Sequence, residues 1–400
     1  MSGILGYVTP VRAYRSAGEI YMQSASGRVA EALATHYEKV LLCARVVQGT
    51  PPAPFDLPLN APNLELVEQP YWSSTAGSLF HFFGIACAYF RTCRRADVLF
   101  VRGMCPYIAV LYLCAAIFRL PVCHWIVGDP IAVLQAGGRK GRVPETFPML
   151  YALQDRAFTR VGRWLTRGAL ICNGRELASA YASPRTVEIV SSTVKDSEIL
   201  ARFDTCQGLI VRILFIGFIR PEKGLEYLLE AVSRLKGDVR WELEIAGPCE
   251  FPDYKIKLQN LATALGIQAQ IRWTGYVPNG ARVLELMRRA DLFALPSLSE
   301  GTPHVLVEAR ASGVPCISTT VGGVPSTVSD GYDALLVPPK DARAFTRAIE
   351  RVICDGQLRR TLIRNGLVAA RRQTLEKFIA TVMQELSANV PMEGGAVAQE

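Results

Sequence analysis

Two glutamates, Glu300 and Glu308, lie on either side of a Gly-Thr-Pro step in the segment "ALPSLSEGTPHVLVEARASGVP". The apolar residues before Glu300 predict a short buried strand, and Thr302 followed by Pro303 predicts a helix N-cap with proline at the first helical position. Glu300 would then lie on the loop and Glu308 inside the helix. Open α/β sheets bind ligands in the crevice at the carboxyl ends of their strands, so we expect both carboxylates beside a ligand.

A sugar nucleotide would use both carboxylates and the helix start. Carboxylates accept hydrogen bonds from pairs of sugar or ribose hydroxyls, and the free amides of a helix N-terminus attract a diphosphate. The alternative is that Glu300 caps the helix and that Glu308 is a solvated helix residue.

The segments around these residues alternate between short apolar runs and helical patterns. In the second half, the runs that read as strands are "VRILFIG", "RWELEIAG", "QIRWTGYV", "ADLFALPS", "VPCISTT" and "DALLVPP". Helices are predicted between them at about residues 223–235, 254–265, 280–289, 303–312 and 341–354. This alternation is typical of an α/β domain with a doubly wound parallel sheet.

The first half repeats this rhythm less cleanly. Its strand candidates are "EKVLLCARVV", "NLELVEQ", "ADVLFVRG", "LPVCHWIVG", "GALICNG" and "TVEIVSS", and the polar "KDSEILARFDTCQG" separates the halves. We predict one Rossmann-like domain over residues 1–206 and a second over residues 207–370. Residues 371–400 should form a helix that packs back toward the first domain, followed by a frayed tail. Two such domains would face each other across a cleft, which is a preferred place for a ligand.

Composition restricts the class of protein. Of the 400 residues, half are hydrophobic and a fifth are charged, which is typical of globular chains with large cores. The 11 cysteines show no CxxC or metal-ligand spacing, so we expect a reducing compartment and no metal site. The N-terminus lacks a secretion signal and the longest apolar stretch is too short to span a bilayer, so we expect a cytoplasmic protein.

A second motif supplies positive charge. Neither half has GxGxxG, but "ILFIGFIRPEKGLEYLLEA" places Gly217 at a strand end and Lys223 at a helix start. Glycine lets the backbone approach a ligand closely, and Lys223 with Arg220 could neutralise a diphosphate. A lysine near a helix start is usually solvated, so this motif gains weight from sharing a domain with the two glutamates.

These motifs together resemble the retaining GT-B glycosyltransferases of the family 4 type, also called glycosyl transferases group 1. The resemblance is carried by "GFIRPEKGLEYLLEAVSRL", "LEIAGP", "IRWTGYV" and "ADLFALPSLSEGTPHVLVEARASGVPCISTTVGGVPSTVSDGYDALLVPP", which cover most of residues 211–339. The spacing from Glu300 to Glu308 is the E-x7-E of that family. The first half matches only in its strand-helix rhythm. The resemblance implies a GT-B fold whose first domain binds the acceptor and whose second binds the nucleotide sugar.

The resemblance also implies roles for individual residues of the donor site. Glu308 would hold the ribose, Glu300 the hydroxyls of the donor sugar, and Lys223 the diphosphate. The remaining donor-site residues would be Gly217, the backbone of Gly301, Thr302 and Pro303 around the sugar and phosphate, and Tyr276 with Val277 beside the nucleobase. One departure concerns Phe218, which stands where the family usually has arginine. Arg220 lies two residues further on and is the candidate replacement.

The acceptor side resembles the family less. "SAGEI", with Gly18 and Glu19, stands where a glycine-rich acceptor loop usually follows the first strand. The family often has a His-Asp pair after the central strand of this domain, and here Gly128 and Asp129 align with it. We expect Asp129 to contact sugar or acceptor. His124, four residues before Gly128, is either a second catalytic candidate or a packed core histidine.

The implied activity is transfer of a hexosyl group from a nucleotide-diphosphate sugar, with retention of configuration and without a cofactor or a metal. Lys223, Arg220 and a helix start would stabilise the leaving diphosphate. The acceptor would be a carbohydrate or a lipid-linked sugar of bacterial polysaccharide, glycolipid or glycoconjugate biosynthesis, and nucleic acid is not an expected partner. The alternative is a sugar-nucleotide-binding subunit with weak or no activity, favoured by Phe218 and Gly128. An epimerase would need acid and base residues that the sequence does not identify.

The charge of the chain suggests a membrane partner. Residues 1–200 contain 20 Lys+Arg and 14 Asp+Glu, which is +6 of the total +8. Four arginines at helical spacing would line one face of a helix that also carries apolar residues: Arg156, Arg160, Arg163 and Arg167, with Phe158, Val161, Trp164 and Leu165 elsewhere on it. A second cluster is Arg91, Arg94 and Arg95. We predict that the first domain docks on the anionic inner face of the cytoplasmic membrane. The alternative is a solvated arginine face on a helix whose apolar side is buried.

Overall fold

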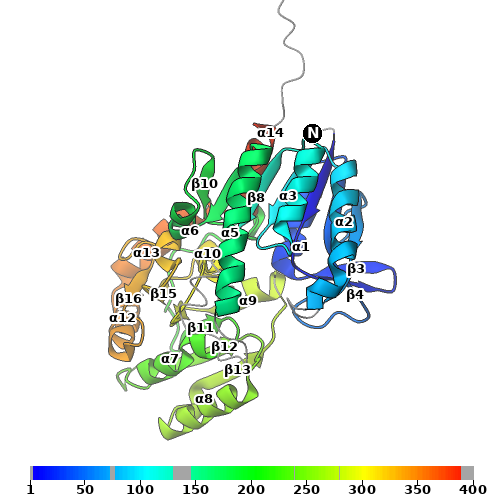
Figure 1. The fold of residues 1–400 in the computed structure, drawn as a ribbon. Helices are drawn as coiled ribbons and strands as arrows, with labels where there is room; N and C mark the ends of the chain where they lie inside the picture. The colour runs from blue at the N-terminus through cyan, green and yellow to red at the C-terminus, as the bar shows by residue number, and fades with distance from the viewer. Residues whose placement is uncertain (1–2, 73–76, 129–145, 238, 279, 389–400) are drawn as a thin grey trace, which may run out of the picture.

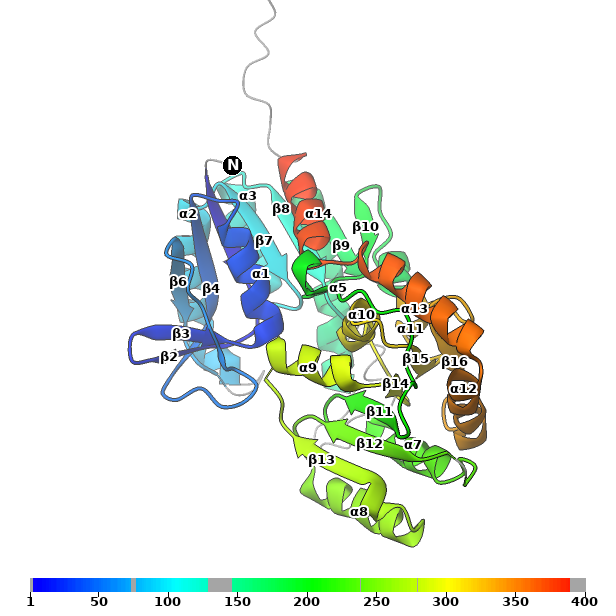
Figure 2. The ribbon, with the colours of Figure 1, turned by 180° about the vertical axis from the view of Figure 1, so that it is seen from behind.

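The computed structural model describes residues 3–72, 77–128, 146–237, 239–278 and 280–388, and they form two α/β domains (Figures 1 and 2). Each domain is built on its own sheet. The predicted two-domain, doubly wound architecture is therefore confirmed. Asp129 lies outside the described residues.

The sheet of the first domain has a parallel core extended by a hairpin. The parallel strands, in spatial order, are β6 (Leu64–Gln69), β4 (Lys39–Gln48), β1 (Ile4–Val8), β7 (Val98–Arg102), β8 (Val122–Ile126), β9 (Ala169–Asn173) and β10 (Thr186–Ile189). Beside β4, the sheet continues with β2 (Ala13–Ser16), β3 (Glu19–Met22) and β5 (Leu57–Pro58). The strand predictions for this half are confirmed, whereas β1, β2, β3 and β5 were not among them.

Helices cover both faces of this sheet (Figures 1 and 2). One face carries α2 (Phe82–Arg95), preceded by η1 (Gly77–His81), then α3 (Ile108–Ile117) and α5 (Thr146–Thr166). The opposite face carries α1 (Ser24–Ala34) and α14 (Leu375–Ser387), whose apolar residues share one core with the strands. A short helix, α6 (Arg175–Ala180), follows β9, and η2 (Asp196–Glu198) lies on the segment leading to the second domain.

The second domain has a six-stranded parallel sheet in the order of a Rossmann fold. Its strands, in spatial order, are β13 (Ile271–Gly275), β12 (Trp241–Ala246), β11 (Val211–Ile216), β14 (Leu292–Leu295), β15 (Cys316–Thr319) and β16 (Leu335–Val337). Its helices are α7 (Leu225–Val232), α8 (Pro252–Ala264), α9 (Ala281–Arg289), α10 (His304–Ala311), α11 (Val324–Thr327), α12 (Ala342–Cys354) and α13 (Gly356–Ala370). Two 3-10 turns, η3 (Pro221–Lys223) and η4 (Gln268–Gln270), complete it. All strands predicted for this half are present.

Local signals explain most of the helix boundaries. Asp341 and Asp355 cap α12 and α13, because their carboxylates accept hydrogen bonds from the amides of Ala344 and Leu358. The helix predicted over residues 223–235 is shorter than expected. Gly224 adopts a left-handed conformation with φ 61°, which separates η3 from α7.

The C-terminal helix α14 returns to the first domain. Its Phe378 ring lies 4.6 Å from the Trp125 ring on β8, and the Leu375 amide donates to the Val194 carbonyl at 2.7 Å. The apolar face of α14 is thus buried on the first sheet, so the two domains are tied together by both the linker and the last helix.

Candidate active site

The site begins at the loop between β14 and α10, where one local prediction is wrong. Helix α10 starts at His304 with Pro303 as the N-cap, and no side chain caps it. Thr302 was expected to be the N-cap and Pro303 the first helical residue. Instead, the Thr302 hydroxyl donates to the Asn173 carbonyl of the first domain at 3.2 Å. Thr302 thus lies outside the helix and contacts the first domain instead of capping α10.

Lys223 and Glu300 come together at the carboxyl edge of the second sheet. The Lys223 Nζ lies 2.6 Å from Glu300 Oε1, and the Ser297 hydroxyl donates to the same oxygen at 2.6 Å. Both charged side chains are mostly buried. A charge-assisted hydrogen bond in such surroundings holds both groups in one geometry. The two residues predicted to hold the diphosphate and the donor sugar therefore lie in direct contact.

Two glycines that sequence reasoning missed position the Glu300 backbone. A Cβ at Gly322 would lie 1.9 Å from the Glu300 carbonyl oxygen, and a Cβ at Gly323 would lie 2.3 Å from the Gly301 carbonyl oxygen. The Gly323 amide also donates to the Glu300 carbonyl. The "VGGVP" segment thus lies against the loop that carries Glu300, and its two adjacent glycines were the available signal.

Gly217 also belongs to a close backbone contact. A Cβ at Gly247 would lie 1.9 Å from the Gly217 carbonyl oxygen, and Gly247 has φ +142°. The strand ends of β11 and β12 therefore approach each other at a point where no side chain fits. The amides of Gly217 and Gly247 donate to the carbonyls of Ala246 and Gly275, so this close approach is part of the sheet edge.

Glu308 lies inside α10 and faces the first domain. Burial raises the pKa of its carboxyl to about 7, while Arg28 opposes the shift and Glu198 adds to it. Glu308, Arg28 and Gly280 line one small cleft between the domains. Arg28 belongs to α1 and donates to Glu198 and to the Thr193 carbonyl, each at 2.8 Å. Sequence reasoning missed Arg28, because nothing in an amphipathic helix signals which arginine meets another domain.

Arg220 is engaged by other residues of its own domain. Its guanidinium lies 2.6 Å from the Glu250 carboxylate and 3.7 Å from that of Glu222, and it stacks on the Phe218 ring with Cζ 4.4 Å from the centroid. Phe218, the residue that departs from the family pattern, therefore packs directly against the candidate replacement cation. For Arg220 to contact a diphosphate, it would have to exchange its ion pair with Glu250.

Tyr276 and Val277 follow β13 at the same edge of the second sheet. The Tyr276 hydroxyl donates to Asp56 Oδ2 in the first domain at 2.8 Å, and burial followed by this hydrogen bond raises the pKa of the phenol. Val277 packs against the core of the second domain. Tyr276 therefore bridges the two domains, whereas Val277 packs within the second.

Gly18 and Glu19 lie in the turn of the β2–β3 hairpin. Gly18 has φ +87°, and the exposed Glu19 carboxylate accepts a hydrogen bond from the Tyr21 hydroxyl at 2.6 Å. The hairpin projects away from the second domain (Figures 1 and 2). This geometry does not support an acceptor role for these two residues, because a turn at the outer end of the sheet does not face the donor site.

His124 lies in the core of the first domain. Its Nε2 donates to the Gly103 carbonyl at 2.8 Å, so Nδ1 is the acceptor for the Tyr112 hydroxyl at 3.0 Å. Burial lowers the pKa of the ring to about 4, so it is neutral at physiological pH. Both nitrogens are used inside the domain, and the catalytic role considered for His124 finds no support in this geometry.

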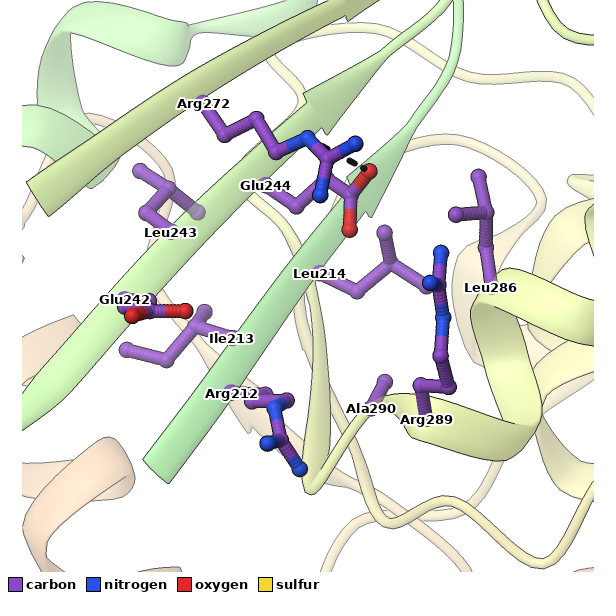
Figure 3. A pocket seen from close by; sticks show the side chains of 10 residues that line it. All are labelled: Arg212, Ile213, Leu214, Glu242, Leu243, Glu244, Arg272, Leu286, Arg289 and Ala290. Atoms are coloured by element: carbon purple, nitrogen blue, oxygen red, sulfur yellow. Dashed lines mark ion pairs between the residues drawn. The ribbon is translucent and has the colours of Figure 1, made fainter. Parts of the chain in front are cut away.

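A separate cavity lies on the second domain, away from these residues (Figure 3). It borders the amino-terminal halves of β11 and β12 and the end of α9, and Arg272 lies 3.8 Å from Glu244 beside it. It contains none of the predicted site residues. The chemistry-bearing side chains gather at the opposite, carboxyl edge of the sheet, so we place the candidate site there.

Two searches concern only the described part of the chain. Within it, no group of three or more His, Cys, Asp or Glu side chains is arranged to hold a metal ion. None of the helices in the described ranges is long and apolar enough to cross a membrane. Metal independence of the reaction stays a prediction.

Comparison with solved structures defines the class of fold. The chain is similar to Anabaena Alr3699/HepE in complex with UDP, with a TM-score of 0.68 and 18% identity, over 96% of this chain and 99% of that one. It is also similar to WaaG, a glycosyltransferase involved in lipopolysaccharide biosynthesis, with a TM-score of 0.66 and 16% identity over 96% and 99%. Both similarities span the two domains. The chain has the GT-B fold.

Sequence comparisons concentrate on the second domain. Residues 211–368 match the family model of glycosyl transferases group 1. The lipopolysaccharide core biosynthesis glycosyltransferase LpsE of Rhizobium meliloti is 28% identical over 240 residues, which are 58% of this chain and 68% of LpsE. D-inositol 3-phosphate glycosyltransferase of Corynebacterium glutamicum is 31% identical over 179 residues, 43% of this chain and 41% of that one. The chain spans about two fifths of the length of several curated relatives that it matches.

Proposed function

We propose that this protein is a retaining, metal-independent glycosyltransferase that moves a hexosyl group from a nucleotide-diphosphate sugar to an acceptor. The observation that carries the proposal is the contact between Lys223 and Glu300 at the edge of the second sheet, with Glu308 on the following helix. A cation for the diphosphate, a carboxylate for the sugar and a second carboxylate for the ribose thus lie along one interdomain face. The matched family and the UDP-bound neighbour support the same class of donor.

The proposed reaction needs few catalytic side chains. The bond between the anomeric carbon and the phosphate oxygen breaks while the acceptor hydroxyl attacks the same face, and the leaving phosphate oxygen takes the acceptor proton. Lys223 stabilises the charge that grows on the leaving diphosphate, and the start of α10 adds its free amides. Glu300 orients the sugar by accepting hydroxyl hydrogen bonds, once the diphosphate has become the partner of Lys223.

A panel of nucleotide sugars tests this proposal directly. Purified protein is incubated with each donor, and release of nucleoside diphosphate is followed with and without candidate acceptors. We expect one donor to be consumed without added metal and in the presence of a chelator, and the product to keep the anomeric configuration of the donor by NMR. An inverted product would contradict retention, and loss of turnover in chelator would contradict metal independence.

The second candidate function is a sugar-nucleotide-binding subunit of a glycan assembly complex. The ion pair of Arg220 with Glu250 and its stacking on Phe218 favour it, because they occupy the second cation of the diphosphate site. Donor binding by calorimetry without release of nucleoside diphosphate for any acceptor would select this alternative.

We also propose that the protein works in the cytoplasm, in lipopolysaccharide-like glycoconjugate synthesis, with its first domain on the inner face of the membrane. LpsE and WaaG are both described as glycosyltransferases of lipopolysaccharide biosynthesis. The supporting surface is formed by η1 and by the neighbouring helices α2, α3 and α5 (Figure 1). It exposes large apolar side chains, and we call it the apolar face: Leu79, Phe80, Phe83, Leu113, Ile117, Leu153, Phe158, Val161, Trp164 and Leu165.

The orientation of α5 argues against the alternative of a solvated arginine face over a buried apolar side. Helix α5 packs on α3 so closely that a Cβ at Gly162 would lie 2.1 Å from the Tyr112 ring. This contact turns Trp164 outward, 74% exposed, while Arg163 is half-buried and Arg160 and Arg167 are exposed. Exposed apolar groups with arginines beside them fit the interface of an anionic membrane.

Sedimentation with vesicles tests the membrane proposal. We expect binding to vesicles that contain anionic lipid at low salt, weaker binding at high salt, and less binding after Arg160 and Arg163 are both changed to Glu. Equal, salt-insensitive recovery with neutral and anionic vesicles would leave a soluble acceptor as the better proposal.

A further inference from the structure

A group of buried polar atoms lies at the carboxyl ends of β1, β7 and β8, facing the start of α10. Each of these atoms is buried and has no hydrogen-bond partner among the described residues: the hydroxyls of Tyr7 and Ser24, Arg102 Nε, Trp125 Nε1 and His304 Nδ1. We call these five residues the Arg102 cluster. Most buried polar side chains in proteins have partners, so several partnerless ones at one edge indicate a function.

Arg102 connects the members of this cluster. Its Cζ lies 5.0 Å from the centroid of the Trp125 ring, and its Nη1 donates to the Ser26 hydroxyl on the first turn of α1, where Ser24 also lies. Burial raises the pKa of the Tyr7 hydroxyl and the charge of Arg102 opposes that shift, whereas burial lowers the pKa of the His304 ring to about 4 and the charge of Arg102 adds to that shift. Residues of both domains therefore surround one guanidinium.

The guanidinium of Arg102 differs from the other buried arginines in lacking a carboxylate. Arg310 lies 2.5 Å from Asp333, and Arg359 lies 2.6 Å from Asp204. Arg102 is only 8% exposed, and among the residues that the structure describes no carboxylate lies within ion-pair distance of it. A buried charge without a counterion among the described residues is destabilising, so this arrangement favours an anion as its partner.

Two helix starts add to the positive charge around Arg102. Helix α1 begins beside it through Ser26, and helix α10 begins beside it with His304. Neither N-cap residue, Gln23 or Pro303, caps its helix with a side chain. Uncapped amides at two helix N-termini, together with a guanidinium, favour an anionic group.

We propose that the Arg102 cluster binds a phosphate group carried by the acceptor substrate. The proposal rests on the glycosyltransferase function proposed above and specifies the class of acceptor. The phosphate belongs to the acceptor because Tyr7, Arg102 and Trp125 come from the first domain, across the interface from Lys223 and Glu300. The hydroxyl of Tyr7, Nε of Arg102 and Nε1 of Trp125 can all donate, which suits an anion with several acceptor oxygens.

Orthophosphate is the probe for the first test, and no donor or turnover is needed. Calorimetry and thermal denaturation are carried out with wild type, Arg102→Met, Tyr7→Phe and Lys223→Ala. We expect orthophosphate to bind wild type and Lys223→Ala equally and to raise their Tm. Its affinity should fall at least tenfold in Arg102→Met and severalfold in Tyr7→Phe.

The tyrosine variants separate binding from folding. The Tyr7 hydroxyl has no hydrogen-bond partner among the described residues, so Tyr7→Phe should keep or raise the Tm measured without phosphate. Tyr37→Phe is the matched control, because the Tyr37 hydroxyl is also buried and partnerless but belongs to the core beside α1. It should leave phosphate binding unchanged.

Three results would overturn the proposal. The first is that wild type does not bind phosphate, and the second is that Arg102→Met binds phosphate as tightly as wild type. The third is that phosphate binding is lost in Lys223→Ala but kept in Arg102→Met. The last result would place the phosphate in the donor site. Nucleotide-sugar affinity is measured in parallel, and a large loss in Arg102→Met would likewise assign Arg102 to the donor. Phosphate binding and donor turnover are measured separately. A failure of the phosphate proposal therefore does not affect the glycosyltransferase proposal, which the panel of nucleotide sugars tests.

Discussion

The two domains share a sheet topology but differ in how their buried polar groups are satisfied. At the edge of the second sheet, Lys223, Glu300 and Ser297 bind one another. At the edge of the first sheet, Tyr7, Arg102 and Trp125 each have a buried polar atom with no hydrogen-bond partner among the described residues. Most of the buried polar side-chain atoms without partners in the described part of the chain belong to the first domain, whereas the second contributes Arg220 Nε and His304 Nδ1.

The two domains show that the same sheet topology can support sites whose polar groups are either paired or without partners. In both domains the strand order reverses beside the first strand, which opens a crevice at the carboxyl edge. In the second domain, the ion pair between Lys223 and Glu300 lies at this edge, and its two residues come from one sequence motif and one loop. The first domain collects its polar groups from β1, β7, β8 and α1, which are far apart in the sequence. The proposed donor and acceptor sites thus differ in how much of each can be recognised as a sequence motif.

The largest effect is expected for Lys223, which lies in the second domain, where the buried charges at the sheet edge are paired. Lys223→Ala should lower kcat by about 100- to 1,000-fold, because the charge on the leaving diphosphate grows during transfer. Steady-state kinetics with the identified donor measures this. A change in KM alone would show that Lys223 binds the ground state and the transition state equally.

The control for Lys223 is Lys257→Ala, which removes an exposed lysine on α8 of the same domain and should leave kcat unchanged. Lys223→Ala also leaves the Glu300 carboxylate without its cation, so its Tm is measured beside wild type. A normal Tm with reduced kcat separates the catalytic role from a folding defect.

The next effect concerns Glu308 and the donor ribose. Glu308→Ala should weaken donor binding by about 1.5–3 kcal/mol, which is the range for a hydrogen bond to a charged group. Isothermal calorimetry measures the change at pH 8, where the wild-type carboxyl is ionised. Unchanged donor affinity in a folded variant would remove Glu308 from the ribose site.

The raised pKa of Glu308, about 7, adds a pH dependence. Only the ionised carboxyl accepts two hydroxyl hydrogen bonds, so wild-type affinity should fall as pH drops below 7, by up to about tenfold per unit. The diphosphate of a nucleotide sugar does not titrate in this range. Glu308→Gln should bind more weakly and show a flat profile between pH 6 and 8, and an equal slope in both proteins would assign the titration to another group.

The third prediction concerns Asp155, a buried polar residue of the first domain. Asp155 on α5 is buried, its Oδ1 has no partner among the described residues, and burial raises the pKa of its carboxyl to about 7. The folded state then holds a proton that the unfolded state has lost, so stability falls as pH rises from about 4 to about 7. Asp155→Asn removes this dependence.

The stabilisation by Asp155→Asn should be about 2 kcal/mol greater at pH 8 than at pH 5.5, from 1.36 kcal/mol per pH unit over the interval up to the folded pKa. Urea unfolding at the two pH values measures it. Asp341→Asn is the control, because Asp341 is a helix cap whose carboxylate is already satisfied. A gain that is equal at both pH values would contradict the assigned titration.

The smallest effect concerns single charges on the membrane side of the first domain. Arg160→Gln should reduce partition onto anionic vesicles about fivefold, because one surface arginine contributes about 1 kcal/mol near anionic lipid. Arg347→Gln removes an exposed arginine from α12 of the second domain and should leave partition unchanged. Equal losses in both variants would indicate a general charge effect and no defined docking face.

The second domain was more predictable than the first because its signals are local. Its strand runs, the caps Asp341 and Asp355, and the E-x7-E spacing each depend on residues close in sequence. One predicted boundary was wrong at Thr302, which lies outside α10 and whose hydroxyl donates to the Asn173 carbonyl of the first domain. In the first domain, the family resemblance indicated Gly18 and His124 as site residues, and these lie in a hairpin turn and in the core. It did not indicate Arg28 or Arg102.

The sequence by itself determined the alternation of strands and helices, the two doubly wound sheets and the presence of the two carboxylates proposed for the donor site. These depend on hydrophobic periodicity and on local backbone preference, which neighbouring residues carry. Only the tertiary structure decided that Lys223 meets Glu300 from 77 residues away, that Arg28 faces Glu308, and that α5 turns Trp164 outward. Such contacts depend on which surfaces the packed sheets and helices bring together, and burial then sets the charge state of the groups they enclose.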